Sequence, residues 1–177
     1  MRVIAGAYGG RVLVAPAGRG TRPTSDRVRE ALFSILGDIA GARVLDLFAG
    51  SGALAIEAVS RGGAEATLVD TSRAAIDVIH RNLEALGIDA EVVRQPAARY
   101  LEAARKHARQ YDLVFLDPPY RHAGALGREL SAALAPVLSA GARVVAESDR
   151  RSPIGLQLPL LDERRYGDTL IQIYASR

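Results

Sequence analysis

The sequence of 177 residues contains no cysteine, and arginine supplies every basic side chain except that of Lys106 and the three histidines. Without cysteine the chain can form no disulfide and can use no thiolate as a nucleophile or metal ligand. Its longest apolar runs are strand-sized, which excludes a membrane-spanning helix. The first residues, Met1 to Gly6, lack the apolar stretch of a signal peptide. We therefore expect a cytoplasmic protein with no membrane partner.

Length and composition indicate one soluble domain, because 177 residues with 49% hydrophobic and 24% charged side chains can build a single substantial core. We expect residues 1–40 to form an N-terminal hairpin, loop and helix, and residues 41–177 to form the cofactor-binding sheet and catalytic core. The net charge of +3 is too small to identify a nucleic-acid partner. The first 43 residues, however, hold seven arginines against three acids, and such a basic region can contact phosphates.

Short β-branched runs alternate with longer helical stretches after residue 42. This pattern predicts an α/β fold, with a mostly parallel sheet and helices on both of its faces. We expect strands at 43–47, 66–70, 90–93, 111–116 and 141–147, and helices at 53–61, 72–86, 96–109 and 126–138. No helix separates the last two expected strands, 155–161 and 169–175, so these should pair antiparallel across a polar turn at 162–168.

The N-terminal region has a different pattern from the rest of the chain. Short strand candidates at 2–4 and 11–14 flank Gly9 and Gly10, which is consistent with a small hairpin. A helix is expected from about Ser25 to Leu36. Its buried face should be formed by Val28, Leu32 and Ile35.

A glycine-rich turn follows the first strand of the expected sheet and opens its helix. Gly50 and Gly52 allow the backbone to turn sharply and to approach a ligand closely. Asp70 ends the next strand, where an acid can bind ribose hydroxyls or can simply cap a helix. The spacing also fits an NAD site. Asp46, just before the turn, suits a ligand with a positive amino group better, such as S-adenosylmethionine.

The run Asp117-Pro118-Pro119-Tyr120 ends the buried strand at 111–116. Two successive prolines cannot continue a sheet ladder, because neither has a backbone N–H group. The Asp117 carboxylate and a proline carbonyl can accept the two hydrogens of a planar amine, and the Tyr120 ring can stack on its face. These residues point to methylation of an exocyclic amine, although a plain strand-ending turn would have the same composition.

Three segments of the chain together resemble the RsmD-type methyltransferases. They are Arg2 to Gly6 with Gly10-Arg11 and the run Thr21 to Phe33, then Val44 to Glu57, and finally Asp117 to Tyr120; Tyr166 to Thr169 is a weaker match. Such enzymes use S-adenosylmethionine to methylate the N2 amine of a guanine in 16S ribosomal RNA. The resemblance implies an enzyme of the guanine(966)-N(2) type. The first segment is the specific one, because the other two recur in many methyltransferases.

The resemblance implies a class I methyltransferase fold, a Rossmann-like sheet of seven mostly parallel strands with its last strand antiparallel. It implies catalytic roles for Asp117, Pro118, Pro119 and Tyr120. Contacts with the cofactor would come from Arg22, Pro23, Thr24, Asp46, Phe48, Ala49, Gly50, Ser51, Gly52, Asp70, Thr71 and Gln95, of which Gln95 stands where similar enzymes often have Asp or Asn. Contacts with RNA would come from Arg2, Arg11, Arg27, Arg29 and Arg121.

Several alternatives remain open from the sequence. The enzyme could methylate an adenine in DNA or a glutamine in a protein, the sheet could bind NAD for an oxidoreductase, or the chain could bind RNA without turnover. Arg27 and Arg29 could form salt bridges with Asp26 or Glu30 in place of RNA contacts. His80, His107 and His122 show no metal-ligand spacing, so we expect no metal. We expect a monomer whose partner is 16S rRNA or the small ribosomal subunit.

Overall fold

One seven-stranded sheet organises the protein, in a computed structural model that describes residues 1–16, 25–118 and 123–176. The strand order is β3-β2-β1-β4-β5-β7-β6. The strands are β1 (Arg43–Asp46), β2 (Glu65–Asp70), β3 (Glu91–Arg94), β4 (Tyr111–Leu116), β5 (Leu138–Asp149), β6 (Leu160–Tyr166) and β7 (Thr169–Ala175). Strands β1 to β5 pair parallel, whereas β7 is antiparallel to both of its neighbours. This confirms the predicted fold class.

The position of the reversed strand bears on the choice of cofactor. Dinucleotide-binding sheets have the order 3-2-1-4-5-6, with no reversed strand between the last two. Here β7 lies between β5 and β6. The topology therefore favours the methyltransferase sheet over the NAD alternative.

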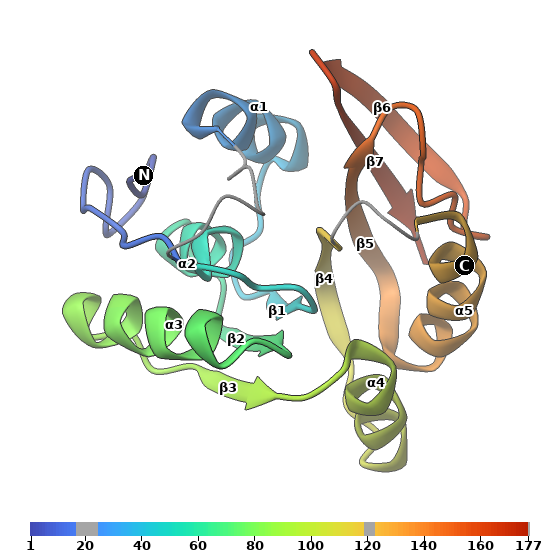
Figure 1. The fold of residues 1–177 in the computed structure, drawn as a ribbon, viewed down its shortest axis with the longest axis horizontal. Coiled ribbons are helices and arrows are strands. Elements are labelled where there is room, and N and C mark those ends of the chain that lie inside the picture. Colours follow the sequence, from blue (N-terminus) through green and yellow to red (C-terminus); the bar gives the residue numbers. More distant parts are fainter. Residues whose placement is uncertain (17–24, 119–122, 177) are drawn as a thin grey trace.

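Helices cover both faces of the sheet (Figure 1). On one side lie α1 (Asp26–Leu36), α2 (Ala53–Ser60) and α3 (Arg73–Leu86), and on the other α4 (Ala97–Lys106) and α5 (Ala123–Leu134). Each side has its own hydrophobic core. Val44 belongs to the core under α1 to α3 and the next residue, Leu45, to the core under α4 and α5. This alternation is that of a strand buried on both faces.

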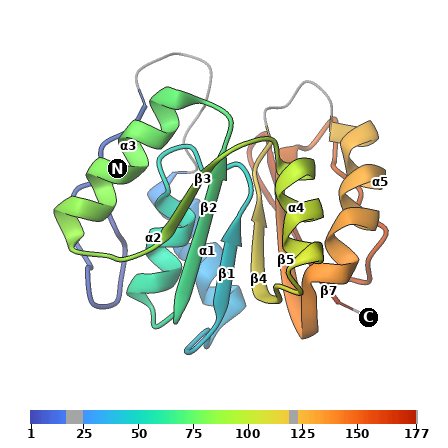
Figure 2. The same ribbon diagram turned by 90° about the horizontal axis from the view of Figure 1, so that it is seen from below.

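The neighbouring strands β2, β1 and β4 stand side by side in the middle of the sheet, and the α4 and α5 helices lie together beyond them (Figure 2). All parallel strands point their carboxyl ends to the same edge, which we call the carboxyl edge. Loops at this edge carry the glycine-rich turn and Asp117. In open α/β sheets this is the edge that binds ligands.

Local sequence signals explain where the helices begin and end. The Ser72 hydroxyl accepts a hydrogen bond from the backbone N–H of Ala75, which caps α3 as predicted. Gly87 ends α3 in the left-handed conformation, at φ +65°. Ser25 caps α1 in the same way by accepting from the N–H of Val28.

The prediction for the C-terminal hairpin is wrong in its first half. Residues 155–159 are not a strand, β6 runs from Leu160 to Tyr166, and the turn consists of Gly167 and Asp168 alone. The polar run 162–166 is a strand because β6 is the sheet edge, where its charged side chains stay in solvent and pair within the strand, as Arg164 does with Asp162. Charged edge strands also resist pairing with other molecules.

Several other boundaries differ from the sequence-based prediction, as where the helix expected at 96–109 runs from Ala97 to Lys106. The helix expected at 126–138 begins at Ala123, ends at Leu134 and continues as a single 3-10 turn, Ala135–Val137. Proline at the start of that turn interrupts the α-helical hydrogen bonding, and β5 begins directly after it. The N-terminal hairpin is reduced to one antiparallel bridge between Arg2 and Val12.

No helix among the described residues is long and apolar enough to cross a membrane.

The buried face of α1 also differs from the prediction. Leu32 is buried as expected, but Val28 and Ile35 are only half-buried at the edge of the core. The other fully buried members are Arg29, Phe33 and Leu36. Arg29 can be buried on this face because it pairs with acidic side chains inside the protein, as described below.

Candidate active site

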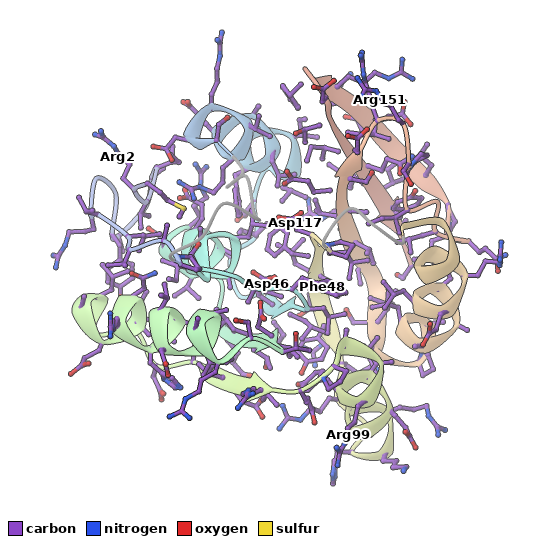
Figure 3. The ribbon with its side chains drawn as sticks, viewed as in Figure 1. Arg2, Asp46, Phe48, Arg99, Asp117 and Arg151 are labelled. Carbon is purple, nitrogen blue, oxygen red and sulfur yellow. The ribbon has the colours of Figure 1, made fainter. Side chains whose placement is uncertain are left out.

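Acidic side chains end three strands at the carboxyl edge. Asp46 ends β1, Asp70 ends β2, and Asp117 directly follows β4. Asp46 pairs in register with Phe115 of β4, so Asp117 lies two residues further along the neighbouring strand. Because side chains alternate along a strand, Asp46, Phe115 and Asp117 share the face covered by α1, where Phe115 packs on Phe33. Asp46, Phe48 and Asp117 gather near the centre of the molecule (Figure 3).

Asp46 is a buried carboxylate with incomplete hydrogen bonding. Its side chain is 1% exposed, and its Oδ1 has no hydrogen-bond partner among the described residues. Burial raises the pKa of Asp46 to about 7, and the negative charge of Asp70 adds to this, although backbone N–H groups of Phe48 and Ala55 oppose it. A buried carboxylate is stable only when it is paired or protonated. The site therefore fits a ligand that brings a positively charged donor.

The glycine-rich turn begins the α2 helix next to this carboxylate. Gly50 and Gly52 both have positive φ, +55° and +78°, which side chains other than glycine rarely adopt. A Cβ atom on Gly52 would lie 2.9 Å from Leu68 Cδ2, so the turn also needs glycine for packing against β2. Gly52 caps α2 without a side-chain acceptor. The Ala55 N–H bonds to Asp46, and a helix N-terminus of this kind can offer its other first N–H groups to a ligand.

Asp70 supports this turn. Its Oδ2 accepts a hydrogen bond of 2.9 Å from the Gly50 N–H, and its Oδ1 accepts one of 2.8 Å from the Ser72 N–H. The residue that caps α3 is Ser72, so the interpretation of Asp70 as the cap itself is wrong. Carboxylate oxygens can accept more than one hydrogen bond each. A ribose contact by Asp70 remains a prediction.

The remaining predicted cofactor residues line the turn or neighbouring strand ends. Ala49 is buried, its N–H bonding to the Val69 carbonyl at 3.0 Å. Ser51 is half-buried, and its carbonyl accepts from Asn82 Nδ2 at 2.9 Å. Phe48 and Gln95 are half-buried, and Thr71 is exposed. Arg22, Pro23 and Thr24 lie outside the described residues.

Asp117 and Pro118 are placed as the sequence predicts, at the end of β4. Pro118 is buried and Asp117 is half-buried. Burial raises the pKa of Asp117 well above its usual range, and the nearby charges of Glu147 and Asp46 raise it further. Asp117 is therefore a carboxyl group that gains from hydrogen-bond donors on a ligand. Pro119, Tyr120 and Arg121 lie outside the described residues.

The basic N-terminal region is divided by the structure into exposed and buried arginines. Arg2, Arg11 and Arg27 are exposed, although Arg2 Nε lies 3.9 Å from Asp26 and Arg11 donates to the Ala85 carbonyl, and their contact with RNA stays a prediction. Arg29 is only 1% exposed and pairs with Asp26 at 2.9 Å. The prediction of an RNA contact by Arg29 is therefore wrong, because its guanidinium is inside the protein. The salt-bridge alternative holds for this residue.

Glu57 on α2 anchors residues 1–16, which we call the N-terminal segment, a role that the sequence did not suggest. Its carboxylate, with the side chain 0% exposed, accepts hydrogen bonds from the backbone N–H groups of Ile4 at 2.7 Å and Ala5 at 3.1 Å. Arg61 Nε donates to the same carboxylate at 2.7 Å. A charged residue in an otherwise apolar helix is a signal for such a buried network. The network fixes the basic segment on α2, near the glycine-rich turn.

The described residues show no metal cluster, and the cavity that they enclose elsewhere does not involve this site. Among the described residues no group of three or more His, Asp or Glu side chains could hold a metal ion. A cavity of about 770 Å³ opens at the amino-terminal ends of the parallel strands, opposite the carboxyl edge. Arg43, Glu65 and Glu91, the first residues of β1, β2 and β3, are among the residues that line it. It contains none of the predicted site residues.

Comparison with known proteins gives a consistent result over the whole chain. A family model described as conserved hypothetical protein 95 matches residues 1–175. The Bacillus subtilis (strain 168) protein named "Putative rRNA methyltransferase YlbH" is 40% identical over 189 aligned residues, which span 100% of both chains. The Escherichia coli (strain K12) protein named Ribosomal RNA small subunit methyltransferase D is 46% identical over 123 residues, 68% of this chain and 61% of the relative.

Solved structures share the fold. One described as "Putative methyltransferase yhhF from Escherichia coli" has a TM-score of 0.85 at 36% identity, covering 100% of this chain and 98% of that one. The Thermus thermophilus methyltransferase RsmC, solved with AdoMet and guanosine, has a TM-score of 0.70 at 22% identity over 91% of this chain and 44% of its own. That likeness concerns the fold alone. By the family match, this chain belongs to the conserved hypothetical protein 95 family, that of the RsmD-type methyltransferases.

Proposed function

We propose that this protein transfers the methyl group of S-adenosylmethionine to the N2 amine of a guanine in 16S ribosomal RNA. The single observation that carries the proposal is the placement of Asp46 and Asp117 at the ends of neighbouring strands, on one face of the sheet. One carboxylate suits the positively charged cofactor and the other suits the amine. The names of the relatives add support for rRNA as the substrate.

The cofactor would be held mainly by the β1 and β2 ends. The unpartnered Oδ1 of Asp46 would accept from its amino group, the α2 N-terminus and the glycine turn would lie against its methionine part, and Asp70 would bind its ribose. The cofactor supplies a methyl group already activated on a sulfonium. The protein then has to align the attacking nitrogen, and alignment of this kind can supply much of the rate.

The chain's own residues would prepare the amine. The Asp117 carboxylate and the Pro118 carbonyl would accept hydrogen bonds from the two N–H groups of the amine. These bonds would favour a more tetrahedral nitrogen and aim its lone pair at the methyl group. Tyr120 would stack on the base after the base leaves its helical stack. Arg2, Arg11, Arg27 and Arg121 would contact phosphates, which adds affinity without base specificity. We propose that the chain acts as a monomer without a metal.

The test is a titration of the purified protein with S-adenosylmethionine and, in parallel, with NAD. Methyl transfer from labelled cofactor to undermethylated small ribosomal subunits and to DNA would follow. Binding of S-adenosylmethionine with label at guanine N2 is the expected result. Label on DNA adenine or on protein would reject the rRNA substrate, and binding of NAD in place of S-adenosylmethionine would reject the cofactor.

A further inference from the structure

Glu147 is a buried acid that the proposed mechanism does not use. It lies near the carboxyl end of β5, directly after the apolar run Val144 to Ala146, and is 4% exposed. Charged groups are rarely buried to this extent without a structural or functional role.

The sheet register places Glu147 beside Asp117. Ala146 pairs with Leu116 across the parallel β4 and β5 strands, and the residue that follows each of them in the chain is an acid. Neighbouring strands are about 4.8 Å apart. Val145 and Phe115 lie two residues before Glu147 and Asp117, and both belong to the core under α1. Because side chains alternate along a strand, Glu147 and Asp117 face the same side of the sheet. Consistent with this proximity, the charge of Glu147 raises the pKa of Asp117.

Two neighbouring carboxylates form a site for a ligand edge that carries several hydrogen-bond donors. Like charges in low dielectric repel, and donors from a ligand relieve this. The Watson–Crick edge of guanine carries such donors side by side, the N1–H and the N2 amine. Adenine and 2,6-diaminopurine have an acceptor at N1, which a carboxylate would repel.

We propose that Glu147 accepts the N1–H of the target guanine while Asp117 holds its N2 amine, so that the end of β5 determines which base is methylated. This inference rests on the proposed function. It assigns a specificity role to a residue that lies outside the Asp-Pro-Pro-Tyr motif. Glu147 would select the base, and Asp117 would orient the reacting nitrogen.

The experiment compares two substrates once the target nucleotide has been mapped. Small subunits are reconstituted with 16S RNA that carries either guanine or 2,6-diaminopurine at that position. Both bases present a 2-amine to Asp117. They differ at N1, where only guanine has a hydrogen, and at C6, where guanine has an oxygen and the analogue an amine, so the Glu147 variant assigns the preference to N1. The native enzyme should prefer guanine in kcat/KM by on the order of ten- to a hundredfold, the discrimination of one good base contact.

Glu147→Gln should shrink this preference to within about threefold, because an amide can either accept from N1–H or donate to an N1 acceptor. Glu65→Gln, an exposed acid at the start of β2, is the matched control and should keep the native preference. Binding of S-adenosylmethionine and the melting temperature of each variant are measured to establish that the fold is intact.

The outcomes separate the two proposals. If the native enzyme methylates guanine N2 and Glu147→Gln keeps the full preference, the specificity role is rejected while the proposed function stands. If Glu147→Gln does not fold, the test is the kcat/KM of the native enzyme on the two bases. Equal values would overturn the specificity role of Glu147. An absence of guanine N2 methylation by the native enzyme would reject the proposed function itself.

Discussion

Arg29 of α1 and Glu57 of α2 lie against each other inside the protein, with Arg29 Nε 4.0 Å from Glu57 Oε2. Their side chains are 1% and 0% exposed. Arg29 also donates to Asp26 and to the backbone carbonyl of Arg2, and burial lowers the pKa of its guanidinium while the two acids oppose this. The pair thus joins two helices and the N-terminal segment through one buried charge network.

Removal of the arginine from this network should destabilise the protein strongly. Arg29→Met leaves the Glu57 carboxylate buried with one cation fewer, and breaking a buried pair typically lowers the free energy of unfolding by about 3 kcal/mol or more. Arg27→Met, an exposed arginine on the same helix, should change it by less than about 0.5 kcal/mol. Urea unfolding of both variants measures the difference. Equal stabilities would show that the buried network contributes nothing.

The exposed arginines should affect RNA binding and leave folding unchanged. Arg2 has a side chain that is 68% exposed, and Arg27 is exposed on α1. If each contacts a phosphate, Arg2→Met or Arg27→Met should reduce the slope of log Kd against log salt by about one. Filter binding to 16S rRNA at several salt concentrations gives this slope. An unchanged slope in both variants would place the RNA elsewhere on the surface.

The affinity for S-adenosylmethionine should depend on pH through Asp46. Its folded pKa of about 7 lies above its ordinary value, so ionisation is disfavoured in the free protein until the pH passes 7. The positive amino group of the cofactor favours the ionised form. The affinity should therefore fall below pH 7, by roughly tenfold per unit at the lower end. Calorimetric titrations at pH 6 and pH 8 measure it.

Asp46→Asn is the variant that tests this cause. It should bind the cofactor at least tenfold more weakly at pH 8 and lose the pH dependence. The raised pKa also means that ionised Asp46 destabilises the native fold as the pH rises from about 4 through 7, so the variant should gain stability relative to the native protein at pH 8. Asp77→Asn on the exposed side of α3 is the control. A pH dependence that survives Asp46→Asn would belong to another group.

Asp117→Asn and Asp117→Ala should strongly lower the rate of methyl transfer while cofactor affinity stays within a few-fold. Loss of one group that stabilises a transition state typically lowers kcat by about 10²–10³. Asp117 directly follows β4, one strand away from the turn that would hold the cofactor. Single-turnover transfer and calorimetric binding, measured on the same preparation, separate the two effects. Near-normal turnover of Asp117→Ala would remove Asp117 from the mechanism.

Two glycines of the N-terminal segment provide a matched pair for testing how the segment is held. Gly6 and Gly10 have nearly the same φ, +81° and +82°, so alanine is strained at either position. A Cβ on Gly6 would lie 1.8 Å from the Ser60 backbone oxygen, whereas one on Gly10 meets nothing within 4 Å. Gly6→Ala should therefore lower the melting temperature by several degrees more than Gly10→Ala. Equal shifts would mean that the close approach to α2 does not matter.

Most of the sheet follows from local sequence signals. The Ser72 and Gly87 caps delimit α3, and apolar runs delimit the central strands, because both signals act within a few residues. The β6 strand was misplaced because its run Asp162 to Tyr166 carries charges that only an edge position tolerates. Whether a strand lies at an edge is a property of the assembled sheet.

The candidate site, like the sheet, has features that follow from local sequence and features that depend on distant residues. Asp46 and Asp117 were recognisable because each stands directly after or at the end of an apolar strand. Glu147 has the same signal at the end of its own apolar run, Val144 to Ala146, and is recognisable from the sequence in the same way. Burial of Arg29 could not be predicted, since it depends on Glu57, which is 28 residues away in the chain.

The attachment of the N-terminal segment has a consequence for engineering. Residues of the segment bond to Glu57 and Ser60 on α2, and the backbone N–H and carbonyl of Val14 both bond to the side chain of Asn82 on α3. The same Asn82 amide holds the Ser51 carbonyl of the glycine-rich turn. A chimaera that exchanged the basic segment with that of a relative would have to carry the matching side chains of two helices with it. Segment and core are therefore best transplanted as one unit.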